Sequence, residues 1–167
     1  MKYKKNKIDT LILSGGGVRC LSFIGAMENL FTNHILSRDL QGIKRIISLS
    51  GGSLFILPFI LKIPLTEIKQ FIYNIDFQKM CDYEDFSMNH ILLNYGLFNN
   101  NYISSVLEEC LRLKGYSKDF SLLDLFKVSN IDFICRVYNL TDNKEEDLNY
   151  ISHPHLSVSK LIQMTTC

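Results

Sequence analysis

The sequence predicts an α/β fold with a mainly parallel central sheet, because a unit of strand, glycine turn and apolar helix occurs twice near the N-terminus. Residues 10–14 form a short apolar run that ends at a glycine, and apolar side chains then recur at helical spacing between Leu21 and Phe31. Residues 43–49 are β-branched and apolar, and a second glycine pair precedes an apolar helix over residues 53–61. Two consecutive units of this kind are typical of parallel sheets.

The rest of the chain adds helices and two further strands without any linker or internal repeat. The predicted elements are, in order, a helix beginning near Pro64, a helix over residues 101–113, a helix capped by Ser121 and Asp124, a strand over residues 131–138, a polar turn over residues 139–147, a short strand over residues 148–151 and a helix over residues 156–164. We therefore expect a single domain over residues 1–167.

The composition is that of an ordinary globular domain and argues against nucleic-acid binding. Hydrophobic residues make up 47% and charged residues 21% of the 167 residues, and the formal net charge is +1. This balance gives no field that would attract nucleic acid. Only Lys2, Lys4, Lys5 and Lys7 form a local basic cluster, and a solvated chain end is favoured there over contact with lipid headgroups.

The cysteine pattern and the apolar segments indicate a reduced compartment. The five cysteines form an odd set without zinc-ligand spacing, so we expect reduced thiols and no metal site. No cofactor is expected either. The basic start lacks the apolar segment of a signal peptide, and the apolar stretch over residues 54–61 is too short to cross a bilayer. A cytoplasmic protein is predicted, with any membrane contact peripheral and the oligomeric state open.

The first motif with chemical content is Ser14-Gly15-Gly16-Gly17-Val18-Arg19-Cys20, which lies where a strand gives way to a helix. Consecutive glycines let backbone N–H groups converge on one small space, as an anion requires. Such a loop can bind the phosphates of a dinucleotide or form an oxyanion hole. The dinucleotide interpretation is disfavoured, because Cys20 occupies the third glycine position of the G-x-G-x-x-G pattern.

The second motif is Ser48-Leu49-Ser50-Gly51-Gly52, again between a predicted strand and a predicted helix. A nucleophile elbow needs small residues two positions before and after its serine, because the turn is strained and tightly packed. Ser48 and Gly52 meet that requirement. Taken alone, the pattern fits an ordinary glycine-rich helix start better than an elbow.

The two motifs together, about thirty residues apart, resemble the patatin-like phospholipase family, whose usual signatures are G-G-G-x-R-G and G-x-S-x-G. The resemblance continues through Ser121-Leu-Leu-Asp-Leu-Phe126, the strand to Arg136-Val-Tyr-Asn-Leu-Thr141 and Leu156-Ser-Val-Ser-Lys-Leu-Ile162. Residues 63–118 are similar only as a helical insertion. The resemblance implies a three-layer α/β/α fold and hydrolysis of fatty-acyl esters in lipids.

Carried over by position, the resemblance makes Ser50 the nucleophile and the amides of Gly15, Gly16 and Gly17 the oxyanion hole, with Arg19 stabilising that loop. Ser48 and Cys20 stand where the family has the first elbow glycine and the last oxyanion-motif glycine. The base of the family's Ser-Asp dyad belongs to an Asp-Gly motif, and the sequence contains no Asp-Gly dipeptide.

The missing motif has two consequences. We expect the domain to be incomplete at its C-terminal end, with the sheet partly bare, and the 167-residue chain to be weak or inactive alone. The four histidines are predicted to be structural or solvated rather than substitutes for the base: His34, His90, His153 and His155. A second interpretation is a catalytically inactive lipid-binding or interaction protein with the same fold.

Overall fold

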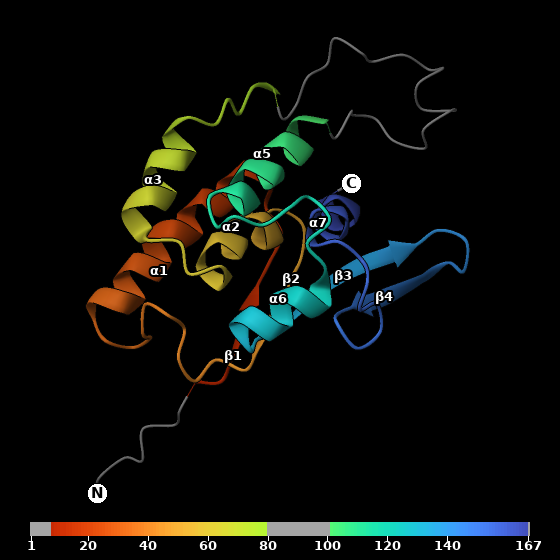
Figure 1. Ribbon diagram of the computed structural model, residues 1–167, viewed down its shortest axis with the longest axis horizontal. Helices are drawn as coiled ribbons and strands as arrows, with labels where there is room; N and C mark the ends of the chain where they lie inside the picture. Colours follow the sequence, from red (N-terminus) through yellow and green to blue (C-terminus); the bar gives the residue numbers. More distant parts are fainter. Residues whose placement is uncertain (1–7, 80–100, 167) are drawn as a thin grey trace, which may run out of the picture.

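A four-stranded, mainly parallel sheet organises the chain (Figure 1). The computed structural model describes residues 8–79 and 101–166. The elements are, in order, β1 (Thr10–Leu13), the 3-10 helix η1 (Gly17–Leu21), α1 (Ser22–Thr32), β2 (Arg45–Ser48), α2 (Gly51–Ile60), α3 (Leu65–Tyr73), α5 (Asn101–Arg112), α6 (Leu122–Ser129), β3 (Asp132–Asn139), β4 (Lys144–Leu148) and α7 (Val158–Thr166).

The strands lie in the order β1-β2-β3-β4, with β1, β2 and β3 parallel and β4 antiparallel to β3. The register pairs Leu13 with Ser48 and Ser48 with Cys135, so the carboxyl ends of the three parallel strands lie at one edge. The loops that follow β1 and β2 therefore meet at that edge, where open α/β sheets bind their ligands. The predicted α/β class with a mainly parallel sheet is confirmed.

The two faces of the sheet differ in burial. Ile46 and Phe133 lie on the face that joins the hydrophobic core, and they are 0% and 2% exposed. The other face carries three isoleucines that are neighbours across the parallel strands: Ile12, Ile47 and Ile134. Ile12 is 76% exposed. Within residues 8–79 and 101–166, the sheet is therefore packed on one side.

Helix α2 lies inside the core. Of its ten residues, nine are buried and only Leu54 is partly exposed, although Pro58 interrupts its hydrogen-bond ladder. A helix that is apolar on all sides is stable only when protein surrounds it. The apolar helix predicted over residues 53–61 is thus present and buried, and its burial fixes the position of the turn that precedes it.

The fourth strand differs from the sequence prediction, which placed it over residues 148–151 and assigned residues 139–147 to a polar turn. The strand instead covers Lys144–Leu148. Two of its acidic side chains are held by Arg136 of β3, whose guanidinium donates to Asp147 at 2.8 and 3.0 Å and to Glu145 at 3.2 Å. An edge strand of this kind has no alternating apolar residues, so the hydrophobic pattern of the sequence did not indicate its position.

The predicted capping box of α6 is confirmed. The Asp124 amide donates to the Ser121 hydroxyl at 3.1 Å, and the Ser121 amide donates to the Asp124 carboxylate at 3.4 Å. The helix ends at Asn130, which adopts a left-handed conformation with φ 57°. Three predictions concern residues outside the described ranges: the basic cluster from Lys2 to Lys7, His90, and the thiols of Cys81 and Cys167.

Candidate active site

Ser50 lies at the sharp turn between β2 and α2. Its backbone has φ 50° and ψ −131°, and it is the N-cap residue of α2. A non-glycine residue in this region costs about 1–3 kcal/mol, so the surrounding structure must hold it there. The side chain is half-buried, and no hydrogen bond joins its hydroxyl to a described residue.

The turn is possible because the first residues of α2 have no side chain. A Cβ added to Gly52 would lie 2.6 Å from the carbonyl oxygen of Ser14, and one added to Gly51 would lie 2.6 Å from that of Gly17. Real Cβ atoms do not approach backbone atoms so closely. The start of α2 therefore packs directly on the backbone of the loop over residues 14–17.

The glycine loop lies beside Ser50. A Cβ on Gly15 would be 3.1 Å from the Ser50 Cβ, and Gly17 has φ +54°, which favours glycine. Within the described part of the chain, no hydrogen bond engages the amides of Gly15, Gly16 or Gly17. Donors left free beside a serine hydroxyl are what an oxyanion hole requires.

Cys20 fills the space beneath this loop. Its side chain is 2% exposed, and its thiol donates to the Ser14 carbonyl at 3.7 Å. A Cβ on Gly51 would lie 3.1 Å, and one on Gly16 3.3 Å, from the Cys20 sulfur. Burial raises the pKa of Cys20, so the thiol stays neutral and acts as a packing group.

Arg19 is exposed, and no ion pair joins it to a described carboxylate. Its backbone amide donates to the Gly16 carbonyl at 3.1 Å, which closes the turn of η1. Arg19 thus contacts the glycine loop through its backbone amide. A role for its guanidinium in stabilising the loop stays a prediction.

A buried polar network lies under the turn and explains how Ser48 is accommodated. The Ser53 hydroxyl donates to the Ser48 hydroxyl at 2.9 Å, and both oxygens lie 3.4 Å from the Cys135 sulfur. Ser48 is 2% and Ser53 0% exposed. Burial raises the pKa of Cys135 to about 11, so its thiol is neutral and available as a weak donor. The network ties β2, α2 and β3 together.

Sequence reasoning missed Thr165, which contacts Ser50 directly. The Ser50 amide donates to the Thr165 hydroxyl at 3.0 Å, and that hydroxyl donates to the Arg136 carbonyl at 2.7 Å. Thr165 and Ser50 are 115 residues apart. No local pattern could have indicated this contact, because it depends on where α7 packs.

No acid–base partner for Ser50 is present among the described residues. His34, His153 and His155 make no hydrogen bond to Ser50, and His153 is instead 3.0 Å from the Ser152 hydroxyl. No described carboxylate is hydrogen-bonded to Ser50 either. The described site therefore has a serine and free amides, without the group that would accept the serine proton.

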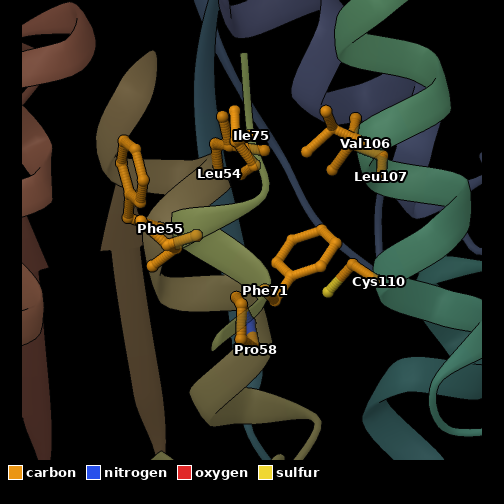
Figure 2. A pocket seen from close by; sticks show the side chains of 9 residues that line it. Leu54, Phe55, Pro58, Phe71, Ile75, Val106, Leu107 and Cys110 are labelled. Atoms are coloured by element: carbon orange, nitrogen blue, oxygen red, sulfur yellow. The ribbon is translucent and has the colours of Figure 1, made fainter. Parts of the chain in front are cut away.

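The apolar cavity beside α2 is small. Figure 2 shows Leu54 and Pro58 from α2, Phe71 from α3, and Val106 and Cys110 from α5 converging on it. Its volume is about 10 Å³, which is about the space for one water molecule. An acyl chain does not fit there in this conformation.

None of the described helices has the length and hydropathy needed to cross a bilayer.

Two viral proteins have sequences similar to that of this chain. A protein of Invertebrate iridescent virus 6 named probable lipid hydrolase 463L is 25% identical over 158 residues, covering 93% of this chain and 52% of the relative. An uncharacterized protein of Acanthamoeba polyphaga mimivirus is 24% identical over 164 residues, covering 98% of this chain and 53% of the relative. The chain thus spans about half the length of the curated relatives it matches.

Solved structures share the fold at low sequence identity. ExoU of Pseudomonas aeruginosa, in its complex with SpcU, gives a TM-score of 0.68 at 14% identity, covering 96% of this chain and 38% of the matched chain. VipD of Legionella pneumophila gives a TM-score of 0.62 at 16% identity, covering 94% and 42%. The family model named patatin-like phospholipase matches residues 11–167. The chain therefore belongs to the patatin-like phospholipase family.

Proposed function

We propose that this chain provides the nucleophile and the oxyanion hole of a serine-dependent lipid acyl hydrolase. The observation that carries the proposal is the strained Ser50 turn, packed against a loop whose Gly15, Gly16 and Gly17 amides are free. Ser50 is the proposed nucleophile, and those amides are the proposed donors. Arg19 follows the loop and is the proposed cation that stabilises it.

The proposed reaction proceeds through an acyl-serine. A base takes the proton of the Ser50 hydroxyl as the Ser50 oxygen attacks the ester carbonyl carbon, and the carbonyl oxygen takes up negative charge that the loop amides stabilise. The bond from carbon to the leaving alcohol then breaks, and the base gives its proton to that alcohol. Water then attacks the acyl-serine, which releases the fatty acid and restores the Ser50 hydroxyl.

The base is proposed to be the aspartate of a Ser-Asp dyad, supplied by residues outside this sequence. An adjacent acceptor is needed because a free serine hydroxyl is a weak nucleophile at neutral pH. Fatty-acyl esters of phospholipids or neutral lipids are the proposed substrates, in line with the family and with the name of the iridescent virus relative. Such substrates imply peripheral contact with a membrane.

The test compares the full-length natural protein with its Ser50→Ala variant. Wild type should be labelled by a fluorophosphonate and should release fatty acid from phosphatidylcholine vesicles, whereas Ser50→Ala should lose both by about 10³-fold or more. Ser105→Ala is the control, because Ser105 is an exposed serine of α5 whose hydroxyl donates to the Tyr102 carbonyl at 2.8 Å. It should retain full labelling.

Two results would contradict the proposal. Hydrolysis that survives in Ser50→Ala assigns the nucleophile elsewhere. A full-length protein that binds vesicles but is neither labelled nor active is the non-catalytic lipid-binding protein of the second interpretation.

A further inference from the structure

We propose that Thr165 is a positioning residue that holds the backbone of Ser50 in its strained conformation, an inference that rests on the proposed role of Ser50. Thr165 belongs to α7 and is 6% exposed. Among the described residues, Thr165 is the one whose side chain forms a hydrogen bond with the Ser50 backbone, and its hydroxyl accepts from the Ser50 amide. Through it, the position of α7 sets the position of the proposed nucleophile.

The hydrogen-bond directions follow from the chemistry of one hydroxyl. A threonine hydroxyl has a single hydrogen and two lone pairs. Thr165 gives that hydrogen to the Arg136 carbonyl at 2.7 Å, which leaves its lone pairs for the Ser50 amide at 3.0 Å. The hydroxyl therefore joins β3 to the turn after β2 at one fixed spacing, and both backbone groups depend on it.

The Ser50 amide needs such a partner. Ser50 is the N-cap residue of α2, so its N–H has no acceptor within that helix. The Gly51 and Gly52 contacts described above fix the residues after Ser50, and the Thr165 hydroxyl fixes its N–H side. Without the hydroxyl, the Ser50 backbone is free to relax from φ 50° toward a less strained conformation.

Relaxation of that backbone moves the Ser50 oxygen relative to the loop amides. Displacement of a reacting group by about 1 Å can reduce a rate about 100-fold. Substrate binding depends on other surfaces, so the effect should fall on kcat and leave KM nearly unchanged. This split distinguishes positioning from a general loss of binding.

Three variants of the full-length protein separate the hydroxyl from its surroundings. Thr165→Val keeps the branched shape and removes the hydroxyl, whereas Thr165→Ser keeps the hydroxyl. Thr166→Val is the matched control, because the bonds of the Thr166 hydroxyl to described residues all go to carbonyls of its own helix, Ile162 at 2.9 Å and Gln163 at 3.0 Å. If Thr165→Val does not fold, Thr165→Cys replaces it, since a thiol is a weak donor and acceptor.

Fluorophosphonate labelling should slow about 10- to 100-fold in Thr165→Val, with Thr165→Ser and Thr166→Val within about 3-fold of wild type. Hydrogen exchange of the Ser50 amide gives a readout that does not need activity, and it should accelerate at least about 10-fold in Thr165→Val alone. Unchanged amide exchange in Thr165→Val overturns the inference even if labelling falls. If wild-type protein is not labelled by the fluorophosphonate but the Ser50 amide exchanges faster in Thr165→Val as expected, the proposed function is overturned. The hydrogen bond between Thr165 and Ser50 is then still established.

Discussion

Gly52 is the residue whose replacement tests the packing of the turn most directly. An alanine Cβ there would lie 2.6 Å from the Ser14 carbonyl oxygen and 3.1 Å from that of Leu13, and neither backbone atom can move without moving β1. We expect Gly52→Ala to lower the free energy of unfolding by about 1–3 kcal/mol, measured by urea denaturation.

Gly25→Ala is the control for this prediction. Gly25 is exposed in α1, and an added Cβ meets nothing within 4 Å. Alanine should raise the free energy of unfolding there by about 0.5–1 kcal/mol, because it restricts the unfolded chain. Equal effects at Gly52 and Gly25 would mean that α2 does not pack on the Ser14 carbonyl as described.

At the level of the element, α6 offers a test of a local signal that the sequence already contains. Ser121 accepts the Asp124 amide at 3.1 Å, and the hydrogen bond from the Ser121 hydroxyl is the largest cause that lowers the pKa of Asp124. We expect Ser121→Ala to lower the free energy of unfolding by about 1 kcal/mol, measured by thermal and urea unfolding. Ser105→Ala, inside α5, should have an effect within about 0.5 kcal/mol. A neutral Ser121→Ala would show that the cap does not stabilise α6.

The strands show where local signals fail. β1, β2 and β3 were predictable because each contains a run of apolar residues, although only Leu13 is buried in β1. β4 was placed wrongly because its residues are mostly charged, and two of them, Glu145 and Asp147, are paired with Arg136 on the neighbouring strand. That stabilisation depends on pairing across a hairpin, and the turn residue Asn143, at φ 53°, gave too weak a signal to place it.

At the scale of the whole molecule, the burial of the two sheet faces can be measured by paired substitutions in the 167-residue chain. Ile46→Ala removes a side chain that is 0% exposed and should lower the free energy of unfolding by about 2–5 kcal/mol. Ile12→Ala removes one that is 76% exposed and should change it by less than about 0.5 kcal/mol. A large loss at Ile12 would show that this face is covered in solution.

The sequence by itself determined the α/β class, the two strand–turn–helix units and the position of Ser50 between a strand and a helix. Each of these depends on residues within a few positions of one another, where periodicity and glycine content act locally. It also indicated which small residues flank Ser50, because a tight turn excludes larger ones at Ser48 and Gly52.

Only the tertiary structure decided what surrounds that turn. The Thr165 hydroxyl reaches the Ser50 amide across 115 residues, and Cys135 meets Ser48 across 87. It also decided which sheet face is packed, since Ile12 and Ile46 are equally apolar in the sequence. Contacts between distant segments depend on how whole elements pack, and no property of either segment alone specifies the partner.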